Sequence, residues 1–415
     1  MNKLRLLHTS DWHLGRTLEG RSRYEEQVQV INEIVDIADE HDVHIVLIAG
    51  DVFDTYNPSA EAQELYCAAL EKLAHDGRRC VLVVAGNHDS PERLCAIRPL
   101  AERQGILIAG RPQETLITNH TNTGVKVVKA GPGWVEIAIP GLPYHAIISH
   151  LPYPSESRLG RIISPELQEG KLRAAYAETV IDLLNRQAQA FRPDTVNLAI
   201  SHLLTLGGQQ SDSERSIEIG GASAVSANCF PETAQYIALG HLHRPQQVQS
   251  ARQKTYYSGS PLAYSFSESG QTKVVYVAEI LPGGEAAVKS VSLTAGIPLE
   301  RWRCFHGVAE ARHRLEELRG KPLWLEIEVH AAGYLTSKEM LSLHQAHAGL
   351  LKVRCIVPTG ASEVSAPVLA DLTLEEMFLR FYRQRRGGVV PKEELVKMFT
   401  KFAGETFVGG GGSDA

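Results

Sequence analysis

The sequence lacks any long run of apolar residues. Crossing a bilayer takes about 20 such residues, and no stretch of the 415-residue chain approaches that length. A membrane-spanning protein is therefore excluded. The amino terminus also lacks the pattern of a secretory signal, because only a brief apolar run precedes Asp11 and no cleavage site follows. We expect a cytoplasmic protein.

Close cysteine pairs are absent as well. The six cysteines are scattered along the chain, which argues against a structural zinc site and against a disulfide framework. An excess of basic residues is also missing, since 42 Lys and Arg stand against 48 Asp and Glu, a net charge of −6. Proteins that bind nucleic acid usually carry a basic surface. Divalent ions held by carboxylates can supply positive charge that this count omits.

What the sequence does contain is an alternation of strand-like and helix-like segments. A chain of 415 residues exceeds the size at which one hydrophobic core keeps growing, so we expect a large domain and at least one smaller one. In the first 110 residues, apolar runs such as HIVLIAG and CVLVVAG alternate with amphipathic segments, such as residues 90–104, which are expected to be helical. This pattern is typical of strands covered by helices on both faces. We predict a layered α/β/α domain over residues 1–294.

The pattern changes after residue 294. A fresh alternation of strands and helices predicts a small α/β domain over residues 297–358, and residues 369–404 contain two helical segments. Each helix has one apolar face, formed by Leu374, Met377, Phe378 and Phe381 in the first and by Leu395, Met398, Phe399 and Phe402 in the second. These faces either pack on the protein's own small domain or dock on a partner. Residues 405–415, which include GGGGSDA, are expected to be a flexible tail.

Metal-ligand residue types follow four of the predicted strands. They lie in the segments DWH (11–13), GD (50–51), GNHD (86–89) and GHLH (240–243). Ligands gather outside the carboxyl ends of strands in α/β sheets, so these loops can converge on one pocket. Within DWH and GHLH the candidates are two residues apart, and such residues project to the same side of an extended chain. The glycines let the backbone approach closely or adopt positive φ.

The residue types indicate which ions are bound. Aspartate and asparagine oxygens mixed with imidazole suit manganese, iron or zinc better than calcium or magnesium. Asp51 is the best candidate to bridge two ions about 3.5–4 Å apart, the arrangement that activates a water and neutralises phosphoryl oxygens together. One such motif means little, but four in order predict a metal centre.

Together with SHLLT (201–205), these segments resemble the calcineurin-like metallophosphoesterase superfamily. LLHTSDWHLGRTL, VVAGNHDSPERL and YSGSPLAYSFSE further resemble the nuclease subunits of bacterial ATP-driven DNA-repair complexes, over most of the chain. The resemblance implies an α/β fold with a layered α/β/α two-sheet core, a small α+β capping domain and C-terminal helices. It also implies two Mn²⁺ ions, with Mg²⁺ or other divalent ions as alternatives. One ion would be held by Asp11, His13, Asp51 and His243, and the other by Asp51, Asn87, His202 and His241.

The resemblance assigns roles around the ions too. His88, beside Asn87, would be the catalytic residue that protonates the leaving oxygen or stabilises the developing charge. Asp89 would either orient His88 or cap the helix that begins near Pro91. Asp54 stands where some archaeal and eukaryotic relatives have a second active-site histidine, and we expect it to hold its loop. The other twelve histidines match no ligand motif.

The implied activity is hydrolysis of DNA phosphodiesters, as an exonuclease on double-stranded ends and an endonuclease on single strands and hairpins. The chain has no G-x-x-x-x-G-K-[ST] loop, so an SMC-like ATPase partner would hydrolyse ATP. The C-terminal helices would dock on that partner and the small domain would contact DNA, in a nucleoid-associated heterotetramer containing a homodimer of this chain. Two alternatives stay open: a small-molecule metallophosphatase with the same ligand set, and a scaffold whose metal site is idle.

Overall fold

A computed structural model of the chain describes residues 2–116, 124–159, 169–209, 211–214, 224–357, 374–385 and 390–408. The chain divides into two units, Met1–Leu299 and Glu300–Ala415. The predicted domain boundaries at residues 294 and 297 stay predictions, and the change of unit comes at Leu299. No helix within the described ranges combines the length and the apolar character that crossing a membrane requires.

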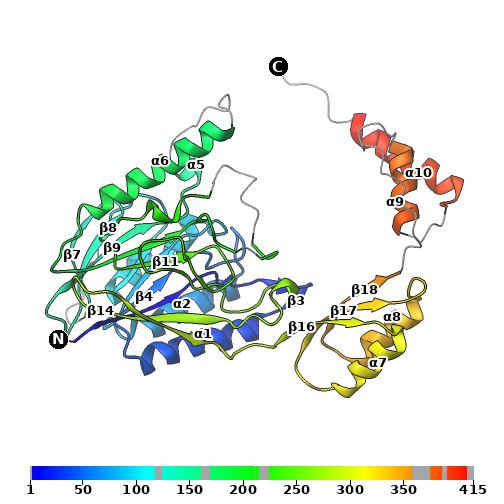
Figure 1. The fold of residues 1–415 in the computed structure, drawn as a ribbon, viewed down its shortest axis with the longest axis horizontal. Helices are drawn as coiled ribbons and strands as arrows, with labels where there is room; N and C mark the ends of the chain where they lie inside the picture. The colour runs from blue at the N-terminus through cyan, green and yellow to red at the C-terminus, as the bar shows by residue number, and fades with distance from the viewer. Residues whose placement is uncertain are drawn as a thin grey trace. The chain divides into compact units, whose positions relative to one another are not determined.

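The first unit contains two sheets (Figure 1). The first sheet has six strands in the order β15-β14-β1-β4-β5-β6. These strands are β1 (Leu4–Thr9), β4 (Ile45–Ile48), β5 (Cys80–Val84), β6 (Ile106–Ala109), β14 (Val274–Ile280) and β15 (Ala287–Ser292). β1, β4, β5 and β6 run parallel. Their connections include α1 (Tyr24–Glu40) and α2 (Ala60–Ala74), whose apolar faces cover the outer face of this sheet.

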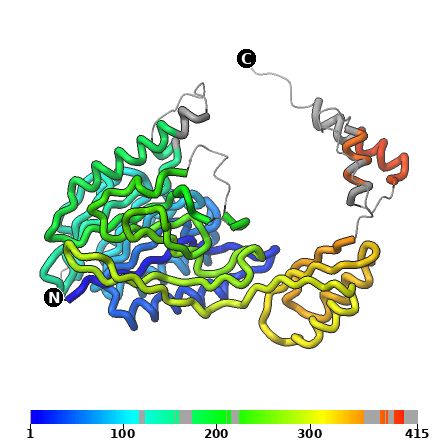
Figure 2. Tube along the Cα trace, viewed as in Figure 1, coloured from blue at the N-terminus to red at the C-terminus, as the bar shows by residue number. Residues whose placement is uncertain are grey.

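The second sheet has seven strands in the order β12-β13-β11-β10-β9-β8-β7. They are β7 (Lys126–Gly131), β8 (Trp134–Ala138), β9 (His145–Leu151), β10 (Val196–His202), β11 (Tyr236–Gly240), β12 (Gln246–Gln247) and β13 (Thr255–Tyr257). Helix α6 (Glu169–Ala188) packs on its outer face. The chain then returns to the first sheet, where β14 pairs antiparallel with β1, as the trace in Figure 2 shows.

The inner faces of the two sheets form the central core. Leu6, Leu47 and Leu82 from the first sheet belong to the same buried cluster as Ile148 and Leu198 from the second. Helices lie on both outer faces. The predicted layered α/β/α two-sheet architecture is confirmed. Short elements complete the unit: a hairpin of β2 (Thr17–Leu18) and β3 (Arg21–Ser22), α5 (Glu156–Leu159), η3 (Ala227–Cys229) and η4 (Phe266–Glu268).

Two details of the predicted secondary structure were wrong. The single helix predicted for residues 90–104 is instead a series of short turns, namely α3 (Pro91–Leu94), η1 (Cys95–Ile97), α4 (Arg98–Ala101) and η2 (Glu102–Gln104). Pro99 breaks the helix because its nitrogen has no hydrogen to donate and its ring clashes with the preceding turn. Strand β9 was not predicted, although its apolar run is buried between β8 and β10.

The second unit begins with a three-stranded sheet in the order β16-β17-β18. Its elements alternate as predicted: β16 (Leu299–Cys304), α7 (Gly307–Glu317), β17 (Trp324–His330), α8 (Ser337–Ala346) and β18 (Leu350–Ile356). Apolar residues of both helices pack on one face of the sheet, around Ile327 and Leu315. Thr336 starts α8 with a capping box, since its side chain and that of Glu339 each accept from the other's backbone N–H. The predicted small α+β domain is confirmed.

Two further helices follow, α9 (Leu374–Arg385) and α10 (Glu393–Val408). The rings of Phe378 and Phe399 stack with centroids 4.1 Å apart, so the two helices pack on each other through their apolar faces. Helix α10 runs four residues into the predicted tail, because the glycine run that ends it begins only at Gly409. Residues 358–367, which we expect from the sequence to form a loop between the small domain and the two helices, and the segment GGGGSDA lie outside the described residues.

Candidate metal centre

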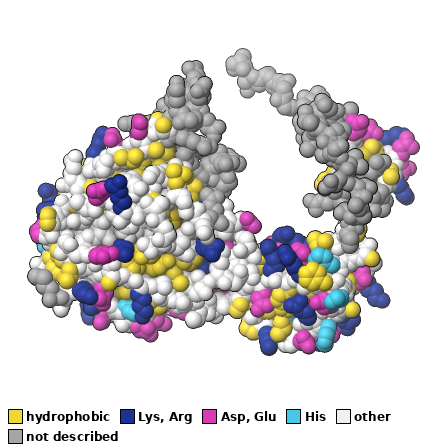
Figure 3. All heavy atoms as spheres, viewed as in Figure 1, with side chains coloured by type: hydrophobic (Ala, Val, Ile, Leu, Met, Phe, Trp, Pro, Cys, Tyr) yellow, Lys and Arg dark blue, Asp and Glu magenta, His cyan; other side chains and the backbone are white. Residues whose placement is uncertain are grey.

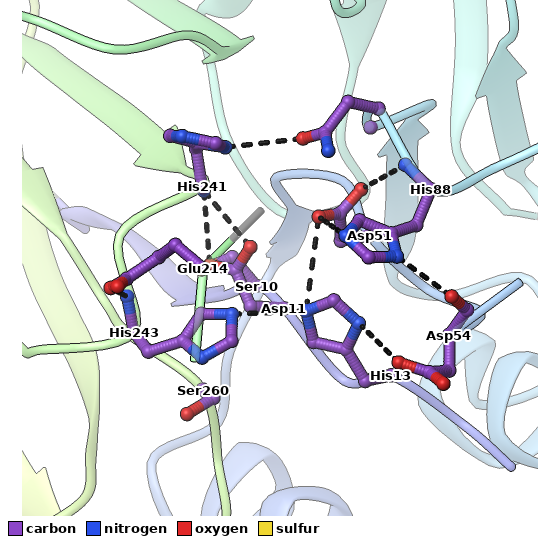
Figure 4. Close-up of polar contacts among 12 residues, drawn as sticks. Ser10, Asp11, His13, Asp51, Asp54, His88, Glu214, His241, His243 and Ser260 are labelled. Atoms are coloured by element: carbon purple, nitrogen blue, oxygen red, sulfur yellow. Dashed lines mark hydrogen bonds and ion pairs between the residues drawn. The ribbon is translucent and has the colours of Figure 1, made fainter. Parts of the chain in front are cut away.

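Five strand ends carry the seven predicted metal ligands. Parallel strands β1, β4 and β5 end at one edge of the first sheet, and parallel strands β10 and β11 end at one edge of the second. Side chains that follow such ends lie close together. The structure brings all seven together where the two edges meet: Asp11, His13, Asp51, Asn87, His202, His241 and His243. Figure 4 labels five of them: Asp11, His13, Asp51, His241 and His243.

Four of the seven have a backbone conformation that is rare for residues with a side chain. The φ angle is 52° at Asp11, 46° at His13, 49° at Asp51 and 107° at His241. The prediction that Asp11 and His13 project from an extended chain was wrong, because left-handed turns direct both side chains inward. Such strain costs about 1–3 kcal/mol per residue and concentrates at functional sites. Backbone hydrogen bonds hold the turns, with the Asp11 N–H donating to Gly50 O at 2.9 Å.

Three glycines permit this close approach, as predicted. A Cβ on Gly86 would lie 2.0 Å from Asp51 Oδ1, and one on Gly240 would lie 1.8 Å from the carbonyl oxygen of Ala49. Gly50 has a φ of +88°, and a Cβ there would lie 2.4 Å from His202 Nδ1. Side chains larger than hydrogen at these three positions would push the strand ends apart.

The first group of ligands surrounds one small space. His13 Nε2 and His243 Nε2 are 3.0 Å apart, and the ligand atoms of Asp11, His13 and His243 all lie within 4.8 Å of one another. His13 Nε2 is 3.8 Å from Asp51 Oδ2. A cation between two imidazole nitrogens that face each other at this distance would stabilise both of them.

The second group lies on the other side of Asp51. Asn87 Oδ1 is 2.8 Å from His202 Nε2 and 3.1 Å from His241 Nδ1. His202 Nε2 is 3.4 Å from Asp51 Oδ2. The same carboxylate oxygen therefore faces both groups, which is the position that a bridging ligand requires.

Burial and neighbouring charges together set the pKa values of these side chains. Burial lowers the pKa of His13 and of His241 to about 3 and raises the pKa of Asp11 to about 6. Burial alone would raise the pKa of Asp51, but the neighbouring His202 and His88 hold it well below its usual range. Burial would likewise lower the pKa of His202, but the charge of Asp51 raises it to about 9. At neutral pH the carboxylates are ionised, and His13 and His241 have free lone pairs.

Groups behind the ligands orient two of the imidazoles. His202 Nδ1 is 2.9 Å from the carbonyl oxygen of Ala49. Because a carbonyl only accepts, Nδ1 carries the hydrogen and Nε2 faces the ligand cluster. His13 Nδ1 lies 3.4 Å from Asp54 Oδ1. Asp54 thus lies behind His13, one of the predicted ligands. The loop-holding role expected for Asp54 stays a prediction.

Sequence reasoning missed the groups behind His243. Its Nδ1 is 2.6 Å from Ser213 Oγ and 3.9 Å from Glu268 Oε1. Glu268 is buried and paired with Lys273, whose ammonium also donates to the carbonyl oxygen of His243 at 2.9 Å. Only Glu268 gave a signal, as the last residue of YSGSPLAYSFSE, because Ser213 and Lys273 belong to no motif.

His88 lies at the rim of the ligand cluster. Its backbone N–H donates to Asp51 Oδ1 at 2.8 Å, and its Nδ1 is 2.7 Å from the carbonyl oxygen of Asp54. That carbonyl accepts the Nδ1 hydrogen, which leaves Nε2 free to face a substrate, 4.0 Å from Asp51 Oδ2. Its side chain is 14% exposed, so it is open to solvent on one side, unlike the buried imidazoles.

Both roles predicted for Asp89 were wrong. Its buried carboxylate accepts the backbone N–H groups of Val52, Phe53 and Gly86, at 3.2, 2.9 and 2.8 Å. It does not contact the His88 ring, and Ser90 caps α3 instead. Asp89 therefore ties the loop after β4 to the loop after β5, and these two loops carry Asp51 and Asn87.

The seven side chains fit divalent metal ions. Two carboxylates, one amide oxygen and four imidazoles form the mixed oxygen and nitrogen set that borderline cations prefer. All but Asn87 are buried. The paired nitrogens of His13 and His243 lie close enough to share one ion. The assignment of each residue as a ligand stays a prediction.

A two-sheet α/β fold with this cluster at its strand ends defines a metallophosphoesterase. The sequence pattern of the family described as Calcineurin-like phosphoesterase matches residues 4–245. The SbcD subunit of the nuclease SbcCD from Bacillus subtilis (strain 168) is 39% identical over 400 residues, which cover 96% of this chain and 98% of the relative. The SbcD subunit from Escherichia coli (strain K12) is 30% identical over 410 residues, 96% of this chain and 97% of the relative.

The chain belongs to the calcineurin-like phosphoesterase family, and within it to the SbcD nuclease subunits. It is a metal-binding hydrolase, and the resemblance noted from its motifs is confirmed. Among solved structures, a dimetal phosphatase from Danio rerio aligns with 71% of this chain and 100% of its own, at a TM-score of 0.39 and 12% identity.

Proposed function

We propose that the protein is a manganese-dependent DNA nuclease that acts in a complex with an SbcC-type SMC-like ATPase. It would act as an exonuclease on double-stranded ends and as an endonuclease on single strands and hairpins. One observation carries the catalytic part: Asp51 Oδ2 faces both ligand groups, 3.8 Å from His13 Nε2 and 3.4 Å from His202 Nε2. The names of the relatives support the partner. We also propose that two copies of this chain form a homodimer within a heterotetramer that includes the ATPase, and that this complex associates with the nucleoid.

We infer that the cluster holds two Mn²⁺ ions, with Mg²⁺ or another divalent ion as the alternative. Asp11, His13, Asp51 and His243 would hold one ion, and Asp51, Asn87, His202 and His241 the other. When bound, such ions supply an activated water and neutralise the phosphoryl oxygens. His202 must release its extra proton for this, so ion binding weakens as the pH falls.

His88 is the proposed general acid. With its Nδ1 hydrogen held by the carbonyl of Asp54, a second proton on Nε2 points toward the space beside Asp51. From there it can pass to the leaving oxygen of the phosphodiester, or stabilise charge that develops on the phosphoryl oxygens. His88→Ala should lower the DNA cleavage rate about 100-fold or more, while Mn²⁺ affinity stays near wild type. Full activity with bound metal would refute this role.

The second unit offers a surface to DNA. On the face of the β16–β18 sheet that α7 and α8 leave open, four cations surround two carboxylates: Arg301, Arg303, Lys352 and Arg354 around Glu326 and Glu328. The side chains of Arg303 and Arg354 are 67% and 50% exposed. Figure 3 shows Lys and Arg side chains gathered on this unit. The excess of positive charge on this face suits the phosphates of DNA. Arg303→Glu should therefore weaken DNA binding and make the binding depend less on salt concentration, because one contact to a phosphate is lost.

Helices α9 and α10 are the proposed docking element for the ATPase. Phe381 and Met398 keep 55% and 54% of their surface exposed, although Phe378 and Phe399 of the same faces are stacked. Apolar side chains left exposed on paired helices favour a partner over self-packing. Deleting residues 369–404 should abolish SbcC binding, and undiminished binding would refute the docking role.

The test of the proposed function is Mn²⁺-dependent degradation of a linear duplex and a hairpin by the purified chain, with and without SbcC. Bis-p-nitrophenyl phosphate serves as a generic phosphodiester in parallel. We expect DNA cutting that Asp51→Ala abolishes. Hydrolysis of the small diester alone, even with the partner present, would instead identify a small-molecule metallophosphatase, and no hydrolysis at all would identify an idle scaffold.

A further inference from the structure

A pocket of about 460 Å³ opens beside His88. It is lined by Arg16, Thr17, Asp54, Thr55, Tyr56 and His88. Two of the lining residues contact the ligand cluster, since Asp54 Oδ1 lies 3.4 Å from His13 Nδ1 and the His88 N–H donates to Asp51 Oδ1 at 2.8 Å. The pocket therefore adjoins the metal centre. Its volume falls within the range of pockets that hold small ligands of roughly nucleotide size.

Tyr56 presents an aromatic ring at this pocket. It is 53% exposed, whereas Tyr66, Tyr257 and Tyr264 of the same unit are buried. A single exposed apolar residue needs no explanation by itself. Here the ring is the one aromatic side chain, apart from His88, among the residues that line the pocket.

Arg158 lies beside both Tyr56 and the loop that carries His88. Arg158 Nη2 donates to the Tyr56 hydroxyl at 3.5 Å and to the carbonyl oxygen of Asp89 at 2.7 Å. Arg158 Nη1 donates to the carbonyl oxygen of Gly86 at 2.8 Å. One guanidinium therefore links Tyr56 to both ends of the loop that carries His88.

Arg16 places a positive charge in the lining of the pocket. Its Nη2 donates to the carbonyl oxygen of Ser213 at 2.9 Å. Its Nη1 is buried and forms an ion pair with Asp54 Oδ1 at 3.6 Å. The pocket thus combines an exposed aromatic ring with the paired charges of Arg16 and Asp54 and two threonine side chains. An exposed aromatic ring is the group on which an unpaired base stacks.

We propose that this pocket binds the nucleotide next to the scissile phosphodiester, with its base unpaired and stacked on Tyr56. The inference rests on the proposed function and names its substrate class: DNA whose strand is single or frayed at the point of cutting. Stacking on an aromatic ring does not distinguish the bases, because each has a π face. The pocket therefore favours unpaired nucleotides without selecting a sequence.

The test compares three variants of the full chain in complex with SbcC and Mn²⁺. Tyr56→Ala removes the ring, Tyr56→Phe keeps it, and Leu100→Ala removes an exposed apolar side chain elsewhere on the unit. Loss of base stacking should raise the KM for a single-stranded oligonucleotide roughly 5- to 150-fold in Tyr56→Ala, with kcat unchanged. Tyr56→Phe and Leu100→Ala should stay near wild type. The kcat for bis-p-nitrophenyl phosphate should match wild type in Leu100→Ala.

A second measurement does not depend on DNA cutting. We expect thymidine 5′-monophosphate to inhibit hydrolysis of the small diester more strongly than deoxyribose 5-phosphate does, and Tyr56→Ala to remove that difference. Equal inhibition by both compounds, or an unchanged KM for the oligonucleotide in Tyr56→Ala, would overturn the proposal. A fall in kcat on the small diester would mean that Tyr56 only supports the fold. Failure of wild type to cut DNA at all would refute the proposed function, and the nucleotide pocket with it.

Discussion

Replacing Asp89 with alanine should loosen the metal centre without removing any predicted ligand. The change leaves three buried backbone N–H groups without an acceptor, those of Val52, Phe53 and Gly86. Each orphaned group costs about 1–3 kcal/mol. Burial and the charge of Asp51 raise the pKa of Asp89, which means that they destabilise its ionised carboxylate. Removing the carboxylate also removes this unfavourable contribution, which offsets part of the cost of the three unpaired N–H groups. We expect the free energy of unfolding to fall by about 3 kcal/mol.

The assay for Asp89→Ala has two readouts. Urea unfolding of the metal-free protein gives the loss of stability, and hydrogen exchange of the peptides around Val52 and Gly86 should show that these amides lose protection. The affinity for Mn²⁺ should fall as well, because the two loops are no longer tied together. Glu92→Ala is the matched control, since this carboxylate is 62% exposed and its ion pair contributes little. Stability and Mn²⁺ affinity equal to the control would refute the reasoning.

Two further predictions concern packing and pH. Gly86→Ala should abolish Mn²⁺ binding in a titration, because its Cβ would lie 2.0 Å from Asp51 Oδ1, whereas Gly333→Ala, with nothing within 4 Å, should bind Mn²⁺ as wild type does. The hydrogen bond from Arg192 lowers the pKa of Glu136 to about 2 against the opposing effect of burial. A carboxylate whose pKa is lowered on folding stabilises the folded protein at pH values above its pKa in the unfolded state, about 4.3 for glutamate. This stabilisation is lost as the pH falls toward the pKa in the folded state. Glu136→Gln should therefore be less stable than wild type by about 1–2 kcal/mol at neutral pH, allowing for the exposure of Arg192. The urea unfolding midpoints of Glu136→Gln and wild type should move closer together below pH 4. A difference between the midpoints that stays constant with pH would contradict the lowered pKa of Glu136.

The sequence predicted where the site lies better than how it is built. Strand ends could be located because apolar runs such as HIVLIAG stop at ligand residues, and parallel strands end at a common edge. The left-handed turns at Asp11 and His13 could not be predicted, since no glycine marks these positions and residues with a side chain adopt positive φ only in a few per cent of cases, even though aspartate and histidine do so more often than most. The spacing of Asp11 and His13 suggested that both side chains point to one site, but on the assumption of an extended chain, which the positive φ angles rule out.

The groups behind the ligands were largely invisible for a different reason. Ser213 and Lys273 reach His243 only through the fold, each 30 residues away in the sequence. Asp89 was noticed, but its three acceptor bonds depend on how the loop after β4 lies against the loop after β5. Local patterns contain no information of this kind, because these contacts join segments that the sheet topology brings together.

The central claim is that one carboxylate, Asp51, is shared between two metal ions. Titration of the metal-free protein with Mn²⁺, followed by the electron paramagnetic resonance signal of the free ion, tests it most directly. The wild type should bind two ions per chain, and Asp51→Ala should bind both far more weakly. Asp42→Ala, which removes an aspartate that is 83% exposed, should behave as wild type. One ion per wild-type chain, or two ions still bound tightly by Asp51→Ala, would contradict the account.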